Sequence, residues 1–290
     1  MKITNKLNFP APLVSMAQEE YEYELNEYRA TSLLKGIRET ILERRYRDQI
    51  VEDVSDKIFL LLGKGVHAAL EKYQETKTQL KEERIKIPIE EYVLSGQFDL
   101  YDDATGTVID YKTTTIWKIV NSQYEDWRRQ LLIYCLLLRQ TGFSARRGQI
   151  FAILRDHRKG EAKRISGYPQ LQAVTINFSF TEQDLQECEE WLQARFNLIR
   201  EAEKLSDDDL PVCTPEERYN DGDQYAVMKK GQKKAVRRLN SLEEAQQFQA
   251  EKGLDRIEVR LGTDKKCIDY CSVNKFCSHY KSLKSVEGVA

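Results

Sequence analysis

The 290-residue sequence contains no apolar run that approaches the roughly 18 residues needed to span a bilayer. The run LLIYCLLL, at 131–138, is too short and is typical of a buried helix. The first residues, MKITNKLNFPAP, lack the apolar core of a signal peptide. We therefore expect a cytoplasmic protein without membrane contact.

An excess of positive charge is also missing, since 45 Lys and Arg face 47 Asp and Glu, for a formal net charge of −2. This balance argues against nonspecific binding of polyanions by the whole molecule, so any nucleic-acid contact must use a local basic patch. The densest patch is MKKGQKKAVRR, which either follows a phosphate backbone or forms a solvated turn. Its six cations are Lys229, Lys230, Lys233, Lys234, Arg237 and Arg238.

Cysteine is sparse and unevenly placed, with six residues in the chain. In a cytosolic protein, cysteines are more often metal ligands or core residues than disulfides. Cys135 and Cys188 fall in helical patterns, and we expect both in the core. The other four form a candidate metal site, a C-terminal trio in KKCIDYCSVNKFCSHY and a distant fourth: Cys267, Cys271, Cys277 and Cys213.

Four thiolates are suited to a [4Fe–4S] cluster or to structural zinc, and spacing alone does not separate the two. The nearby His279 also keeps a Cys/His zinc site open. The surrounding segment has little apolar content, so a bound metal would explain how this end of the chain is held.

Hydrophobic periodicity predicts an α/β fold, a sandwich with a mixed sheet flanked by helices. The expected elements are helices at 38–50, 56–73, 122–139 and 181–205, and strands near 83–94, 97–101, 107–113, 148–155 and 171–180. Thr181 is expected to cap the last helix together with Asp184, and Pro88 should lie at a sheet edge or a break.

The helix at 56–73 is expected to bury one side. That side is formed by Ile58, Leu61, Leu62, Val66, Ala69, Leu70 and Tyr73.

The break SDDDLPVC, at 206–213, divides the chain into a core domain, 1–205, and a small C-terminal module, 206–290. The module should contain the basic hairpin, a helix, a strand and the cysteine site. We find no internal repeat and no low-complexity segment.

The stretch GQFDLYDDATGTVIDYKTTT, at 96–115, predicts a β-hairpin closed by DDATG. If Asp102 pairs with Thr107, Asp99 lies opposite Asp110, and Lys112 shares a face with Asp110. Carboxylates so placed repel each other, and a divalent cation would offset the repulsion. The alternative is a solvated hairpin with ordinary surface charges.

Two flanking helices add candidate polar groups. His67 lies on the helix at 56–73, one turn after Gly63, and imidazole is a common ligand for divalent metals. Gln130 and Tyr134 share a face of the helix at 122–139 and would orient a phosphate, a base or a water. Taken alone, a half-exposed histidine and a core tyrosine are the simpler readings.

In order, the chain therefore carries G-x-x-x-H, G-x-x-D, D-Y-K and Q-x-x-x-Y between Gly63 and Tyr134. This series resembles the RecB-like branch of the PD-(D/E)XK nuclease superfamily, although Phe98 stands before Asp99 where proline is usual. The resemblance implies a restriction-endonuclease-like core with Mg²⁺ or Mn²⁺ bound by His67, Asp99, Asp110 and the Tyr111 carbonyl. It implies that Lys112 orients the attacking water, and that Gln130 and Tyr134 position the DNA strand.

By the same resemblance, the expected activity is that of a DNA nuclease, and specifically an exonuclease in recombination, repair or phage DNA processing. Its partners would be single strands or duplex ends and a recombination or helicase protein, in a bacterial cytoplasm or in a phage host. Further DNA contacts are expected at Lys64, Arg128 and Arg129. The alternatives are a non-catalytic nucleic-acid-binding or assembly module and an enzyme that acts on RNA or nucleotides.

Iron–sulfur members of that branch, the CRISPR-adaptation exonucleases and the helicase-linked AddB-type nucleases, carry a comparable C-terminal cysteine trio. The likeness implies a [4Fe–4S] cluster on the four cysteines, with zinc as the alternative. In those relatives the fourth cysteine precedes the nuclease core, whereas Cys213 follows it here.

Overall fold

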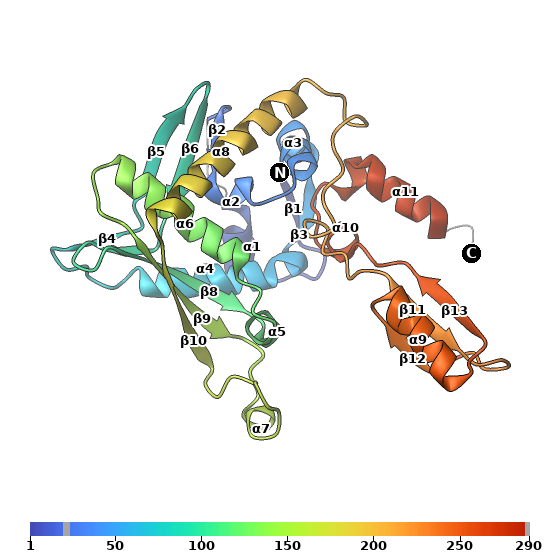
Figure 1. Ribbon diagram of the computed structural model, residues 1–290. Coiled ribbons are helices and arrows are strands. Elements are labelled where there is room, and N and C mark those ends of the chain that lie inside the picture. The colour runs from blue at the N-terminus through green and yellow to red at the C-terminus, as the bar shows by residue number, and fades with distance from the viewer. Residues whose placement is uncertain (20–23, 288–290) are drawn as a thin grey trace. The chain divides into compact units, whose positions relative to one another are not determined.

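The computed structural model describes residues 1–19 and 24–287 (Figure 1). The chain divides into two compact units. The first contains Met1–Lys35 and Asp48–Glu203, and the second contains Gly36–Arg47 and the chain from Lys204 onward. The second unit thus includes a segment from the N-terminal part of the chain, which the predicted division at 205/206 assigned to the core domain.

The first unit is built on a five-stranded sheet with the order β10-β9-β8-β7-β4. Strands β8 and β9 are parallel and the other neighbours are antiparallel, so the sheet is mixed, as predicted. The strands are β4 (Gln79–Lys81), β7 (Leu100–Asp102), β8 (Thr107–Thr114), β9 (Arg147–Leu154) and β10 (Ala173–Ser179).

Helices cover this sheet on two sides (Figure 1). Helix α6 (Glu125–Gln140) packs closely on β9, where a Cβ added to Gly148 would lie 2.7 Å from Leu131 Cδ1. Helix α4 (Ile58–Leu70) packs on β8, where a Cβ at Gly63 would lie 3.4 Å from Thr113 Oγ1. Since Thr113 and Asp110 point to opposite faces of β8, the two helices cover opposite faces.

Helix α8 (Glu182–Glu203) packs against α6. It begins with the predicted reciprocal cap, in which the Asp184 backbone N–H donates to Thr181 Oγ1 at 3.1 Å and the Thr181 N–H donates to Asp184 Oδ2 at 2.8 Å. Cys135 on α6 and Cys188 on α8 are both buried.

The hairpin between β7 and β8 has the predicted register, with Asp102 opposite Thr107. The preceding strand differs from the prediction, because the chain leaves one sheet and enters another at Phe98 and Asp99. Strand β6 (Tyr92–Gln97) ends there, in a separate three-stranded sheet with the order β2-β6-β5. The predicted run at 83–94 is therefore two strands, and Pro88 lies in the edge strand β5 (Arg84–Ile89); β2 is Glu27–Arg29.

The predicted apolar side of α4 is wrong in part, because the helix presents Gly63 and His67, not its large apolar residues, to the sheet. Leu61 is the buried residue of α4, and it packs with Ala17 and Val54 beside helix α1 (Ala11–Gln18). Several of the remaining apolar side chains are exposed: Ile58, Phe59, Leu60, Leu62 and Tyr73.

Smaller elements complete the first unit. They are β1 (Lys2–Thr4), α2 (Ala30–Leu33), 3-10 helices at Arg47–Gln49 and Val54–Lys57, β3 (Val51–Asp53), α5 (Ile116–Val120) and α7 (Lys159–Ala162).

The second unit combines α3 (Ile37–Arg45) with the C-terminal elements. The predicted hairpin is present as β11 (Gln224–Met228) and β12 (Arg237–Leu239), and β13 (Arg256–Arg260) completes an antiparallel sheet with the order β12-β11-β13. The helices are α9 (Leu242–Lys252), α10 (Lys265–Asp269) and α11 (Ser278–Glu287), with a 3-10 turn at Asn274–Phe276. Within the described part of the chain, no helix is long and apolar enough to cross a membrane.

Candidate active site

Asp99 contacts candidate catalytic residues on two other elements, α4 and β8. It lies directly before β7 and is buried. Its Oδ2 accepts the Tyr111 N–H of β8 at 2.5 Å, and its Oδ1 lies 3.1 Å from His67 Nδ1 on α4. The observed register, extended by one residue, places Asp110 opposite Asp99, as the sequence predicted.

A continuous polar network links β8 to α6. The Lys112 Nζ lies 2.6 Å from Asp110 Oδ2 and donates to Gln130 Oε1 at 3.0 Å. The Gln130 Nε2 donates to Asp110 Oδ1 at 3.2 Å and to the Tyr134 hydroxyl at 2.7 Å. Gln130 is thus a buried bridge that orients Lys112 and Asp110.

The electrostatics of this network favour a cation. Burial raises the pKa of Asp110, the charge of Asp99 raises it further, and Lys112 opposes both. The pKa of His67 is raised, mainly by its hydrogen bond to Asp99. Bound protons and the Lys112 ammonium therefore offset the negative charge of Asp99 and Asp110. A divalent ion bound at this site would neutralise the same charge.

Glu82 is a candidate ligand that the sequence analysis missed. One side-chain donor atom from each of His67, Glu82 and Asp99 lies within 4.8 Å of the others. The Glu82 N–H donates to the Asp99 carbonyl at 3.1 Å, which fixes the two residues side by side. Burial and the Asp99 charge raise the pKa of Glu82 to about 7. A third ligand of this kind completes a nitrogen–oxygen donor set typical of Mg²⁺ or Mn²⁺.

The backbone explains why no motif marks Glu82. Its φ of 53° places it in the left-handed region, which non-glycine residues rarely adopt and which clusters at functional sites. This kink separates β4 from β5 and turns the side chain toward Asp99. Gln97, at the end of β6, donates to the Glu82 carboxylate at 2.9 Å and holds it there.

The glycine of G-x-x-D serves packing. A Cβ at Gly96 would lie 2.5 Å from Leu137 Cδ1 and 2.9 Å from Tyr134 Cε1. Only glycine allows α6 to approach β6 so closely, and this approach sets the position of Tyr134.

The cations predicted to contact DNA are of two kinds: three contact other groups of the protein, and the six of the basic hairpin are exposed. Lys64 donates to the carbonyls of Met16 and Glu19 at 2.8 and 3.2 Å. Arg128 pairs with Asp184, and the Arg129 guanidinium lies 4.7 Å from the centre of the Trp191 ring, so both tie α6 to α8. All six cations of the basic hairpin, at 229–238, are exposed.

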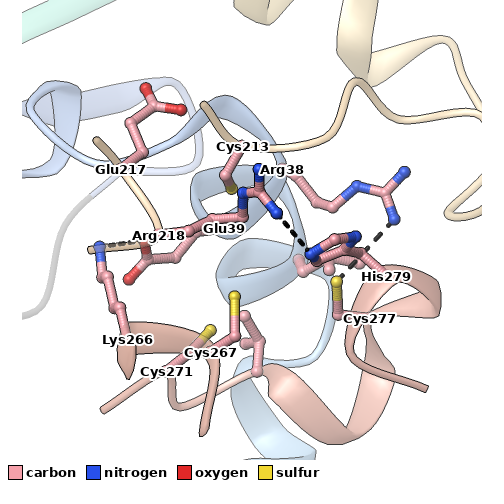
Figure 2. Close-up of a pocket in the computed structure, with 12 residues that line it drawn as sticks. Arg38, Glu39, Cys213, Glu217, Arg218, Lys266, Cys267, Cys271, Cys277 and His279 are labelled. Carbon is pink, nitrogen blue, oxygen red and sulfur yellow. Dashed lines mark hydrogen bonds and ion pairs between the residues drawn. The ribbon is translucent and has the colours of Figure 1, made fainter. Parts of the chain in front are cut away.

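The second unit gathers the four candidate cysteines around one cavity of about 20 Å³ (Figure 2). Cys213 lies against the start of α3, where a Cβ at Gly36 would be 2.5 Å from its Sγ. Cys267 belongs to α10, and Cys271 and Cys277 follow it. All four are free thiols.

Charged side chains surround this cavity. Arg38 donates to Ser278 Oγ at 2.7 Å and approaches Cys277 Sγ at 3.9 Å, and Lys266 pairs with Glu39 at 2.5 Å. The predicted alternative ligand His279 lies 2.8 Å from Asp264 Oδ2, and these two offer donor atoms within 4.8 Å of Cys267 Sγ. Burial raises the pKa of Cys267 to about 11 and that of Cys271 to about 12.

The comparison with protein families identifies the core. The sequence matches the PD-(D/E)XK nuclease superfamily over residues 16–278, which is most of the chain. The chain belongs to this superfamily. Its members generally use divalent metals for phosphodiester hydrolysis, which agrees with the donor set around Asp99.

Solved structures similar to this chain include SSO0001, with 19% sequence identity and a TM-score of 0.45 over 64% of this chain and 82% of that chain. A phage-related exonuclease from Haemophilus somnus 129PT has 15% identity and a TM-score of 0.36 over 60% of this chain and 96% of its own. No curated protein matches the sequence.

Proposed function

We propose that this nuclease-superfamily protein is a divalent-metal-dependent DNA exonuclease of the RecB-like branch, active in recombination, repair or phage DNA processing. One observation carries the proposal. Asp99 contacts both His67 and the Tyr111 backbone, while Asp110, opposite Asp99, contacts Lys112 and Gln130. Four short motifs thus meet in one polar centre, as a hydrolytic site requires.

The donor set fits Mg²⁺ or Mn²⁺. The ligands would be His67, Asp99, Asp110 and the Tyr111 carbonyl, with Glu82 as an additional carboxylate. Hard oxygen donors with one imidazole suit these ions better than a tetrahedral zinc site does. When bound, the ion supplies charge neutralisation and an acidified water for attack on phosphorus.

The remaining residues bind and orient. Lys112 carries a positive charge beside Asp110, where it would orient the attacking water and stabilise charge that develops on the phosphate oxygens. Gln130 fixes the Lys112 ammonium through its carbonyl oxygen. Tyr134 holds the Gln130 amide in that orientation, and since both side chains are buried, they would position the strand indirectly, through Lys112 and Asp110.

The test is hydrolysis of end-labelled DNA by Asp110→Asn with Mg²⁺ or Mn²⁺. We expect cleavage to fall by about 10³-fold, the usual order for loss of a group that stabilises the transition state. Asp48→Asn, which changes an exposed aspartate of the same unit, is the control and should leave cleavage unchanged. Wild-type cleavage by the Asp110→Asn variant would refute the proposed centre.

The product pattern tests the exonuclease part of the proposal. Successive release of mononucleotides or short products from a labelled end supports it. Internal cuts in circular DNA, or cleavage of RNA alone, would replace it with an endonuclease or an RNA-directed enzyme.

For the second unit, we propose a metal centre held by Cys213, Cys267, Cys271 and Cys277. The four thiols line one cavity and are deprotonated when they bind metal. The sequence resemblance favours a [4Fe–4S] cluster. Zinc is the alternative, and His279 and Asp264 offer donor atoms within 4.8 Å of Cys267 Sγ for such a site.

Anaerobic purification separates these two centres. A brown protein with visible absorbance and four irons per chain, the composition of one [4Fe–4S] cluster, supports the cluster. A colourless protein with about one zinc supports the alternative. Cys213→Ser should lower occupancy in either case, whereas Cys188→Ala, which alters a buried core thiol, should not. Full metal occupancy in Cys213→Ser would exclude that residue as a ligand.

A further inference from the structure

The first turns of α4 expose an unusual amount of apolar surface. Phe59 is 61% exposed, and its neighbours Ile58, Leu60 and Leu62 are exposed too. A large aromatic side chain in this setting is the kind of feature that marks an interaction surface. Its position is informative, because Phe59, Gly63 and His67 are spaced by four residues and share one stripe of the helix.

Phe59 lies close to the candidate active site along that stripe. Two helical turns separate it from His67, which corresponds to about 12 Å along the axis. Gly63 lies between them, and a Cβ added there would lie 3.4 Å from Thr113 Oγ1 on β8. Phe59 and His67 therefore share one stripe of α4 with only a glycine between them.

Arginine forms the other part of this surface. The Arg155 guanidinium lies 4.0 Å from the centre of the Phe59 ring, a stacking contact that leaves both residues exposed. The Arg155 N–H donates to the Thr114 carbonyl at the end of β8, only two residues beyond Lys112. The stack is thus anchored to the strand that carries Asp110 and Lys112.

The segment that follows Arg155 is strongly basic. Residues 155–164 contain five cations and two acids, in a chain with a net charge of −2. Both acids are engaged, since Asp156 accepts the Ile116 N–H at 2.8 Å and Glu161 pairs with Arg158 at 3.3 Å. Among the described residues, no acidic group pairs with the exposed Lys159 or Lys163. The positive charge is therefore available to a polyanion.

We propose that Phe59 and Arg155 form a stacking surface for an unpaired base of single-stranded DNA, with the phosphates held by Lys159 and Lys163. Aromatic rings beside cations bind single strands because every base has a π face, whereas the bases of a duplex are already stacked on each other. The inference rests on the proposed function and sharpens it. The substrate form that reaches the metal ligands is an unpaired strand, either free or at a frayed duplex end.

The test is the affinity of Phe59→Ala for fluorescein-labelled oligothymidylate, measured by anisotropy in EDTA so that no hydrolysis occurs. We expect about tenfold weaker binding, the lower range for loss of one base–aromatic stack. Phe59→Trp should bind at least as tightly as wild type. Leu60→Ala, an exposed neighbour on another side of α4, is the matched control and should bind like wild type. Equal affinities for Phe59→Ala and Leu60→Ala would overturn the proposal.

A series of oligonucleotides, each with one abasic position, identifies the stack. One abasic position should weaken binding by wild type and not weaken binding by Phe59→Ala any further, since both changes remove the same contact. If every abasic position weakened binding by Phe59→Ala as much as by wild type, the proposal would be overturned. It would also be overturned if Phe59→Ala weakened binding of blunt duplex DNA equally, or weakened binding of oligouridylate but not of oligothymidylate.

Failure of the proposed function would look different. If wild type cleaves no DNA with Mg²⁺ or Mn²⁺ but the Phe59 dependence of binding holds, the nuclease assignment fails and the stacking surface stands. If wild type cleaves DNA and Phe59→Ala neither weakens binding nor raises KM, the stacking surface fails alone.

Discussion

The two candidate metal sites differ in how their ligands are held before a metal binds. In the first unit, each carboxylate already has polar partners, as Asp99 does in His67 and Tyr111 and Asp110 does in Lys112 and Gln130. These contacts fix the ligands by hydrogen bonds that do not need the ion. The candidate active site is therefore preorganised.

In the second unit, the thiols are held by weaker contacts, because sulfur is a weak hydrogen-bond acceptor. Backbone N–H groups of Glu39 and Val273 reach Cys213 and Cys271, and Arg38 lies 3.9 Å from Cys277 Sγ. Cys267 and Cys271 have pKa values raised by burial, so they are protonated and neutral at physiological pH. The ligands also come from distant parts of the chain, Cys213 against α3 and the trio near α10. A centre of this kind is stabilised mainly by the metal itself, and it couples metal binding to folding.

The largest expected effect is that of metal removal on the folding of the second unit. Removal of the proposed cysteine-bound metal with a chelator should unfold the second unit and leave the first folded, because structural metals contribute about 10 kcal/mol or more and domains are stable by about 5–15 kcal/mol. Hydrogen exchange should lose protection in Gly36–Arg47 and after Lys204 while β8 and α6 keep theirs. Equal loss of protection in both units would contradict the comparison.

Gly36→Ala should weaken the cysteine site without touching the active site. The new Cβ would lie 2.5 Å from Cys213 Sγ, so the thiol must move from its place at the start of α3. We expect metal affinity at this site to fall by about 10–100-fold, the range for a disturbed ligand support. Competition with a chromogenic chelator measures it.

The control is Gly65→Ala in α4. No heavy atom lies within 4 Å of its added Cβ, so that variant should keep the metal and gain slightly in helix stability. Equal metal affinity of Gly36→Ala and wild type would show that Cys213 is not a ligand.

Gly96→Ala applies the same change to the first unit. Its Cβ would lie 2.5 Å from Leu137 Cδ1, so α6 must move or repack, at a cost of about 1–3 kcal/mol. We expect a lower thermal midpoint and lower DNA cleavage, since α6 carries Gln130 and Tyr134. Gly160→Ala, with open space around its Cβ, should melt and cleave like wild type. If Gly96→Ala instead lost metal from the cysteine site, the two sites would not be independent of each other.

Much of the first unit could be predicted because its site is local in sequence. The turn DDATG fixed the register of Asp102 with Thr107, and this register alone places Asp99 opposite Asp110. Helical spacing placed Gln130 and Tyr134 on one face. The mixed sheet followed from the alternation of helices and strands.

Features that depend on tertiary packing were not predictable. The kink at Glu82 has no signal in residue type, since glutamate seldom adopts positive φ. Nor did periodicity reveal that α3 groups with the C-terminal elements or that several apolar side chains of α4 stay exposed. Periodicity reports which face of an element is apolar, whereas the chain topology decides what covers it.

The smallest expected effect is on Mn²⁺ affinity at the candidate active site, and Glu82 gives its most specific test. Its pKa of about 7 means that the carboxyl is largely protonated at pH 6 and ionised at pH 8. The pKa of His67 is also raised, by its hydrogen bond to Asp99, and this acts in the same direction because an imidazolium cannot bind a metal. Protons therefore compete with the ion at low pH. We expect Mn²⁺ affinity at the active site to rise from pH 6 to pH 8, with protons released on binding.

Glu82→Gln should lower Mn²⁺ affinity at pH 8 by about tenfold, the lower range for loss of a supporting ligand. It should also flatten the rise in affinity between pH 6 and pH 8, since one competing proton site is gone. Glu83→Gln, an exposed neighbour, is the matched control and should retain the wild-type profile. Calorimetry in buffers of different ionisation enthalpy measures affinity and proton release together. Wild-type proton release by Glu82→Gln would show that His67, and not Glu82, is the group that exchanges a proton for the metal.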